Sequence, residues 1–144
     1  QQLMRQRFAE QGVAASRLEL RGPTGLADMM AEYADVDIAL DPVPYNGGTT
    51  TLQAMWMGVP VLCLQGAHFV SRMGASFMTA AGLPDWVARD DDDYVVIAQR
   101  VASDRHALLK LKRSLREDLL KRKAWDVLAH TQALQALIIS LALQ

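Results

Sequence analysis

The sequence predicts an α/β fold: a doubly wound parallel sheet with helices on both faces, followed by several helices. Two observations predict it. Short apolar segments alternate with helix-like segments, which is the order that parallel βαβ units require. The run VPVLCL at residues 59–64 is apolar throughout, as expected of a strand that is covered on both faces. The length of 144 residues suits one domain rather than two, so residues 1–144 are expected to form a single domain.

The N-terminal part of the chain is predicted to form two helices and two strands. Apolar residues at helical spacing predict helices over residues 1–11 and 26–33, and Gly12 ends the first of them. RLELRG, residues 17–22, alternates polar and apolar positions and predicts a short strand. VDIALD, residues 36–41, predicts a second strand.

The central part contains a helix between two apolar segments. The pattern predicts this helix at about residues 50–57. Gly58 and Pro60 mark its end, and the strand VPVLCL follows directly. A further helix is expected over residues 69–81, and residues 86–88 are expected to add a short edge strand.

The C-terminal part is predicted to be helical. Asp90–Asp93 precede a helical pattern, and we expect them to cap that helix and complement its dipole rather than to bind calcium. Basic residues over 105–123 alternate with leucines, which indicates a solvated helix face. A last helix is expected over residues 125–143. Trp56 and Trp125 occupy apolar helical positions and are assigned to the core.

Charge and cysteine content argue against several classes of protein. Fifteen basic residues against sixteen acidic ones argue against a nucleic-acid-binding surface. Cys63 has no second cysteine to pair with, so we expect a buried thiol in a reducing compartment, without a disulfide or a Cys/His metal cluster. The apolar segment ALQALIISLAL is shorter than the roughly 20 residues of a membrane-spanning helix. A soluble, cytoplasmic domain without membrane contact is expected.

The stretch NGGTTT, Asn46 to Thr51, is the first candidate for a functional site. In an open α/β sheet, ligands bind beyond the carboxyl ends of the strands, and this loop follows the predicted strand that ends at Asp41. Glycines let backbone N–H groups approach an anion, and the first N–H groups of a helix lack partners within it. Thr49 and Thr50 add hydroxyl donors. Two interpretations stay open: a phosphate site that needs no metal, or a tight turn with Thr49 as the helix cap.

Other motifs are weaker. Neither the P-loop, with its lysine after the second glycine, nor the G-x-G-x-x-G fingerprint occurs in the sequence. Asp35-Val36-Asp37 matches a D-x-D motif that binds a metal–nucleotide, but it opens a predicted strand at the end opposite the ligand edge, so no metal site is assigned to it. His106 and His130 are expected to lie on helical surfaces without a functional role.

The sequence around the loop resembles a known enzyme family. LQAMWMGVPVL, residues 52–62, is similar to the donor-binding helix and strand of GT-B glycosyltransferases. Together with DIALDPVPYNGGTTT (37–51) and HFVSRMGAS (68–76), it resembles the C-terminal catalytic half of the O-linked N-acetylglucosamine transferase family, including bacterial members with tetratricopeptide repeats. The resemblance covers nearly the whole chain and is densest over residues 36–83. It implies a Rossmann-like domain, one half of a GT-B enzyme, without a metal or other cofactor.

The resemblance also implies an activity and a set of binding residues. The family moves N-acetylglucosamine from UDP-GlcNAc to serine or threonine hydroxyls of proteins. Carried over to this sequence, the residues that face the donor diphosphate are Asn46, Gly47, Gly48, Thr49 and Thr50, and Gln53 faces the ribose. His68 and Arg72 belong to a loop that lies near the donor. Arg72 is expected either to contact phosphate or to form a salt bridge with a carboxylate such as Asp41.

Three positions differ from residues that are common in the family. The ribose position usually carries a carboxylate, and here it is Gln53, which accepts hydrogen bonds without charge. Because charge-assisted hydrogen bonds are roughly twice as strong as neutral ones, weaker donor binding is expected. A histidine in the helix before VDIALD is replaced by Met29. A histidine found in the loop of animal members is Gly48 here, as in many bacterial members.

A GT-B enzyme closes a cleft between two Rossmann-like halves, and the acceptor side and the candidate general base come mostly from the other half. We therefore expect residues 1–144 to bind UDP weakly and to be inactive alone, and the catalytic residues stay unassigned. The expected partners are the UDP-sugar donor, a protein acceptor, the N-terminal catalytic half and a tetratricopeptide repeat region.

Two other functions stay open on the sequence alone. One is a non-catalytic module that binds a nucleotide or nucleotide-sugar, which Gln53 and Met29 suggest. The other is a structural domain that forms oligomer contacts through the apolar helix at residues 133–143. Because the last helix of GT-B proteins often packs on the partner half, we expect the isolated chain to self-associate as a homo-oligomer.

Overall fold

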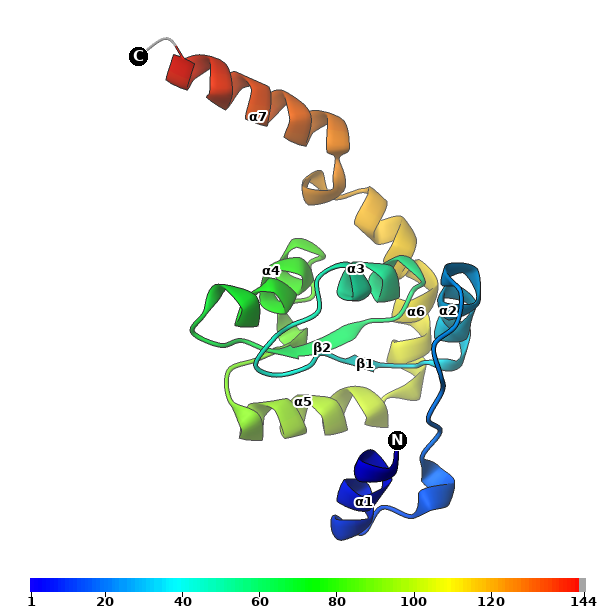
Figure 1. Ribbon diagram of the computed structural model, residues 1–144. Helices are drawn as coiled ribbons and strands as arrows, with labels where there is room; N and C mark the ends of the chain where they lie inside the picture. The colour runs from blue at the N-terminus through cyan, green and yellow to red at the C-terminus, as the bar shows by residue number, and fades with distance from the viewer. Residues whose placement is uncertain (143–144) are drawn as a thin grey trace.

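The computed structural model describes residues 1–142, and it contains a small parallel sheet between helices (Figure 1). The strands are β1 (Ala39–Leu40), β2 (Val61–Leu64) and β3 (Val87–Ala88), in the order β1-β2-β3. Both pairings are parallel, with Ala39 opposite Val61 and Cys63 opposite Val87. The apolar run VPVLCL therefore contains the central strand, as predicted. The predicted edge strand at residues 86–88 is confirmed at Val87–Ala88, while Trp86 belongs to the preceding 3-10 turn.

Helices cover both faces of this sheet. The helices of the described residues are α1 (Gln2–Glu10), α2 (Leu26–Glu32), α3 (Thr49–Trp56), α4 (Met73–Ala80), α5 (Asp91–Ser103), α6 (Arg105–Leu120) and α7 (Val127–Ala142). In Figure 1, α3 and α4 lie on one side of the sheet and α5 lies on the other. Short 3-10 turns occupy Ala15–Arg17, Tyr33–Asp35, Phe69–Ser71, Pro84–Trp86 and Lys123–Trp125.

The core is built around β2. Its fully buried side chains include Met55 of α3, Leu62 of β2, Met78 of α4, and Leu115 and Leu119 of α6. Helices α3, α4, α5 and α6 each bury apolar residues in this core and leave polar residues in solvent. Helix α3, which follows the glycine–threonine loop, is therefore fixed against both the sheet and α6.

The predicted strand at residues 17–22 was wrong. The segment is extended, but no strand of the described chain pairs with it. The exposure of the side chains still alternates along the segment, because Leu18 and Leu20 are half-buried while Glu19 and Arg21 are exposed. Alternation reports only which side of an extended segment is covered, whereas a strand also needs a hydrogen-bonded neighbour.

The predicted helix over residues 69–81 is divided into a 3-10 turn and α4. The Ser71 hydroxyl donates to the backbone carbonyl of His68 at 2.9 Å and accepts from the backbone N–H of His68 at 3.1 Å. These two bonds close a tight turn before the α-helix begins at Met73. Gly82 follows the helix with a positive φ of 74°, in the role that its position predicted.

The Asp35-Val36-Asp37 motif is held by basic side chains. Arg21 bonds Asp35 at 2.8 Å, and Lys112 of α6 bonds Asp37 at 2.9 Å. Lys112 also donates to the carbonyl oxygen of Val36 at 2.6 Å. This part of the predicted strand is therefore tied to α6 rather than to the sheet, which leaves only Ala39–Leu40 as β1.

The C-terminal helices follow the prediction, whereas the predicted burial of two tryptophans needs a correction. The Asp90 carboxylate caps α5 by accepting from the backbone N–H of Asp93 at 2.8 Å. Trp56 and Trp125 are only half-buried, whereas Trp86 is buried in the core. Their apolar helical positions therefore overestimated their burial, because each lies at the rim of the core.

Helix α7 extends away from the sheet and its flanking helices (Figure 1). Every residue of α7 is exposed; the predicted end of this helix at Leu143 lies outside the described residues. Within residues 1–142, none of the helices has the length and hydrophobicity needed to cross a bilayer.

Candidate functional site

The glycine–threonine loop lies where the sheet ends. The backbone N–H of Asp41 donates to the carbonyl of Leu62 at 2.9 Å, so the pairing of β1 and β2 continues one residue beyond Leu40. Asn46 then donates its backbone N–H to the carbonyl of Val70 at 2.9 Å. The loop and the segment after β2 therefore meet at the carboxyl edge of the sheet, where ligands of open α/β sheets bind.

Asp41 lies beneath the loop and is 5% exposed. Its Oδ1 accepts from the backbone N–H of Gly47 at 2.7 Å and, at the long distance of 3.5 Å, from the hydroxyl of Thr51. Its Oδ2 is buried and has no hydrogen-bond partner. Burial raises the pKa of this carboxyl, although the bonds from Gly47 and Thr51 act in the opposite direction.

Asn46 takes a different position from the one expected of a phosphate ligand. It is 1% exposed, and its side-chain amide donates to the carbonyl of Pro42 at 3.1 Å. Its Oδ1 accepts from the backbone N–H of Gly74 at 3.3 Å. The Asn46 side chain thus points inward and holds the loop against α4.

The residues after Asn46 form the entry to α3. Thr49 and Thr50 are exposed in the first turn of α3, while Thr51 is buried. The first N–H groups of this helix have no acceptor within it, and the loop contains no side chain at Gly47 or Gly48 that would block them. A Cβ on Gly47 would lie 2.7 Å from the Thr50 hydroxyl oxygen, which is too close, so the turn requires glycine.

Gln53 and Met29 lie on different elements. Gln53 is half-buried on α3, one turn after the threonines. Met29 is half-buried on α2 and lines a hollow of about 470 Å³ together with Glu19, Arg21, Glu32, Tyr33, Asp35 and Val36.

Tyr33 also lines a smaller hollow of about 160 Å³ beside Asp41 and Thr50, and its hydroxyl donates to the carbonyl of Thr50 at 3.3 Å. Tyr33 therefore lines both the hollow at Met29 and the hollow beside Asp41 and Thr50.

His68 and Arg72 are exposed at the same edge. The expected salt bridge between Arg72 and Asp41 was wrong: among residues 1–142, no ion pair involves either side chain. The reason is burial, since Asp41 lies under the loop while Arg72 is exposed just before α4.

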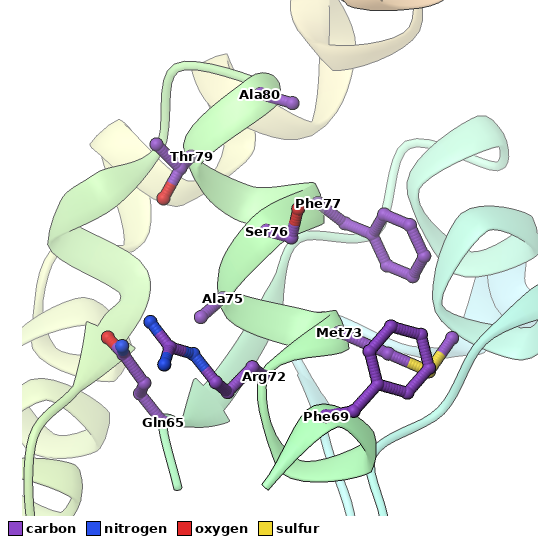
Figure 2. Close-up of a pocket in the computed structure, with 9 residues that line it drawn as sticks. All are labelled: Gln65, Phe69, Arg72, Met73, Ala75, Ser76, Phe77, Thr79 and Ala80. Carbon is purple, nitrogen blue, oxygen red and sulfur yellow. The ribbon is translucent and has the colours of Figure 1, made fainter. Parts of the chain in front are cut away.

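A cavity of about 750 Å³ opens beside α4 (Figure 2). It is lined by Gln65, Phe69, Arg72, Met73, Ala75, Ser76, Phe77, Thr79 and Ala80. In Figure 2, Arg72 points towards Gln65 on one side, whereas Phe69, Met73 and Phe77 lie on the other. The residues of the glycine–threonine loop do not line it, but the methyl group of Met73 lies 3.1 Å from the place of a Cβ on Gly48.

Sequence analysis missed the supporting role of Asp41, Tyr33 and Gly74. Asp41 carried a usable signal, because a carboxylate directly after an apolar strand lies at the ligand edge. Tyr33 and Gly74 carried none, since each acts through a contact with a distant segment. Among the described residues, no group of three or more His, Cys, Asp or Glu side chains is arranged to hold a metal ion.

Comparison with known proteins identifies the family. The model of glycosyl transferase family 41 matches residues 4–134. The chain belongs to glycosyl transferase family 41. A solved structure of an O-GlcNAc transferase mutant from Thermobaculum terrenum is 41% identical to this family 41 chain, with a TM-score of 0.78, over 82% of this chain and 23% of the other.

Two curated relatives show how the family 41 chain compares with longer proteins. The barley protein "Probable UDP-N-acetylglucosamine--peptide N-acetylglucosaminyltransferase SPINDLY" is 39% identical over 76% of this chain and 12% of its own length. A Caenorhabditis elegans UDP-N-acetylglucosamine--peptide N-acetylglucosaminyltransferase is 28% identical over 76% of this chain and 10% of its own length. The chain thus spans about a tenth of these relatives. The family resemblance and the Rossmann-like, GT-B fold class are confirmed.

Proposed function

We propose that this chain is the donor-binding half of a glycosyltransferase that moves N-acetylglucosamine from UDP-GlcNAc to serine or threonine hydroxyls of proteins. The observation that carries the proposal is the loop at the carboxyl edge of the sheet. Two exposed threonines, Thr49 and Thr50, lie there at the start of α3. The names of the relatives, which describe this transfer, support the choice of reaction.

The chemistry of the loop suits a diphosphate. The positive end of a helix dipole favours negative charge by about 0.3–1 kcal/mol. In the proposed complex, the N–H groups at Gly48–Thr50 and the two hydroxyls donate to phosphate oxygens without a metal. Gln53, one turn further along α3, accepts from the ribose hydroxyls, and Arg72 supplies a positive charge from the side of α4.

The remaining parts of the reaction lie outside residues 1–144. The acceptor site and general base belong to the N-terminal catalytic half, and a tetratricopeptide repeat region presents the protein acceptor in the cytoplasm. Under this proposal the isolated chain does not transfer sugar. Transfer of N-acetylglucosamine to a peptide by the chain alone would contradict this part of the proposal.

A non-catalytic nucleotide-binding module is the second candidate. It is favoured by Gln53 and Met29, which replace a carboxylate and a histidine of the family pattern with uncharged side chains. The two candidates differ in transfer activity once the chain is combined with an N-terminal catalytic half. Both require a nucleotide at the loop.

The experiment is a titration of the isotopically labelled chain with UDP, followed by amide NMR shifts. We expect shifts centred on residues 47–53, which disappear in Thr50→Val and persist in Thr24→Val, which replaces an exposed threonine in the segment before α2. Inorganic phosphate and GDP serve as comparisons for the phosphate and base contributions. An intact fold with no shifts at millimolar UDP, or shifts that Thr50→Val leaves unchanged, would reject the proposed site.

A further inference from the structure

Asp41 is an acid buried without a cation. Among residues 1–142 it takes part in no ion pair, and one of its two carboxyl oxygens has no hydrogen-bond partner. Burial, with a smaller contribution from the charge of Asp41, raises the pKa of the Cys63 thiol on β2 and of the Tyr94 hydroxyl on α5. Burying a charge without a partner costs free energy, so this side chain weakens the core in which it lies.

The Oδ1 atom of Asp41 accepts hydrogen bonds from two residues of the loop and the helix start. Through Oδ1 it contacts Gly47, at the turn, and Thr51, in the first turn of α3. The hydrogen bond to Gly47 is short at 2.7 Å, as is usual when the acceptor is charged. The segment between these two points contains Gly48, Thr49 and Thr50, so its two ends are fixed from beneath, and Thr49 and Thr50 are exposed.

Helix α4 completes this support. Gly74 donates its N–H to Asn46, and a Cβ at this position would collide with Asp41 Oδ2. The loop, the buried carboxyl and the first turn of α4 therefore pack as one unit. A residue that breaks the rules of core composition is expected where a site demands it.

We propose that Asp41 is the positioning residue of the donor-binding loop, which fixes Gly47 and Thr51 so that Gly48–Thr50 are preorganised for the diphosphate. This inference rests on the proposed function. Asp41 acts through the hydrogen-bond acceptor at Oδ1, and it does not touch the donor. An asparagine keeps an acceptor at this place and puts its amide nitrogen where the unpartnered oxygen lies, whereas an alanine removes the tether.

The test is UDP affinity of the 144-residue chain by amide shifts in wild type, Asp41→Ala, Asp41→Asn and Cys63→Ala. Loss of the tether is expected to weaken UDP binding by at least about tenfold in Asp41→Ala. Asp41→Asn is expected to stay within about threefold of wild type, because the acceptor geometry remains. Cys63→Ala is the matched control, since it removes a buried atom next to Asp41 without touching the loop. The amide proton of Gly47 is expected to shift in Asp41→Ala and to stay near its place in Asp41→Asn.

The outcomes are distinguishable. Wild-type binding that Asp41→Ala leaves unchanged would overturn this inference and keep the proposed function, whereas a wild type that does not bind UDP would remove both. An Asp41→Asn variant as weak as Asp41→Ala would show that charge matters rather than the acceptor, which also overturns the inference. If Asp41→Ala does not fold, the amide proton of Gly47 in wild type is followed against pH. The chemical shift of this amide proton is expected to change over the pH range in which the Asp41 carboxyl is protonated. A shift that does not change over that range would contradict the hydrogen bond between Asp41 and Gly47.

Discussion

The guanidinium carbon of Arg116 lies 4.2 Å from the centre of the Trp56 ring. Trp56 is the last residue of α3, and Arg116 projects from α6. The pair thus joins the end of the loop-bearing helix to a helix that comes later in the chain. A positive charge at a helix C-terminus also complements the dipole. The same helix is therefore held at its start by Asp41 and at its end by Arg116.

Replacing Arg116 by alanine is expected to lower the free energy of unfolding by about 0.5–1 kcal/mol, the range of exposed cation–π contacts. Arg113→Ala, an exposed arginine on the same helix, is the matched control and is expected to change less. Urea denaturation of both variants measures the difference. Equal effects of the two substitutions would show that the Trp56 contact contributes nothing.

Gly74→Ala is expected to be destabilising. The new Cβ would collide with Asp41 and lie 2.9 Å from Cys63 Cβ, and overpacking of this kind costs about 1–3 kcal/mol. Gly22→Ala is the control, because a Cβ there meets nothing within 4 Å. Thermal unfolding of the two variants compares them, and a Gly74→Ala protein as stable as Gly22→Ala would contradict the close packing of α4 on the loop.

Gln53→Glu is expected to tighten UDP binding. A carboxylate accepts hydrogen bonds about twice as strongly as an amide carbonyl, so the ribose contact gains while the length of the side chain is kept. Gln99→Glu, on the exposed face of α5, introduces the same charge far from the loop and is expected to leave affinity unchanged. Titration with UDP distinguishes them. Weaker binding in Gln53→Glu would mean that position 53 faces the phosphates rather than the ribose.

The Cys63 thiol is expected to resist thiol reagents in the native state. Burial, with a smaller contribution from Asp41, raises its pKa to about 12 from the ordinary 9.0. Between these values the unfolded chain releases a proton that the native chain keeps, so this group makes stability fall as pH rises from about 9 towards 12. Denaturation in alkaline buffers is expected to show a shallower decline in Cys63→Ala. Rapid labelling of native protein at pH 8 would contradict the burial.

Self-association of the isolated chain is expected to depend on α7. Leu134, Leu137, Ile138 and Leu141 are each at least half exposed and lie at the spacing of one helical face. Ile138→Lys is expected to shift light scattering towards the monomer, whereas Gln135→Lys on the same helix is not. A wild-type chain that stays monomeric at high concentration would contradict the prediction.

The parallel sheet and most helices could be predicted because their signals are local. The apolar run at 59–64 and the glycines after α1, α3 and α4 report burial and helix ends within a few residues. The strand at 17–22 was wrong because pairing depends on a neighbour that the local pattern does not contain. β1 is shorter than predicted, and the carbonyl of Val36 accepts from a lysine 76 positions away instead of from a strand. A local pattern does not contain such a contact.

In the candidate site, too, features with a local sequence signal could be predicted, and features that depend on distant contacts could not. The place of the loop follows from the order of strand, glycines and helix, and the structure puts the threonines at the start of α3 as expected. The inward position of Asn46 depends on Pro42 and Gly74, and the isolation of Arg72 from Asp41 depends on the depth at which Asp41 is buried. Side-chain direction in a loop is set by such tertiary contacts, so residue type alone predicts it poorly.

One flexible side chain separates the cavity beside α4 from the glycine–threonine loop. Met73 lines that cavity, and its methyl group limits the room above Gly48. Methionine adapts its shape readily, so an occupant that pushes Met73 aside changes the space over the loop without touching it. The cavity and the glycine–threonine loop are therefore in steric contact through the side chain of Met73.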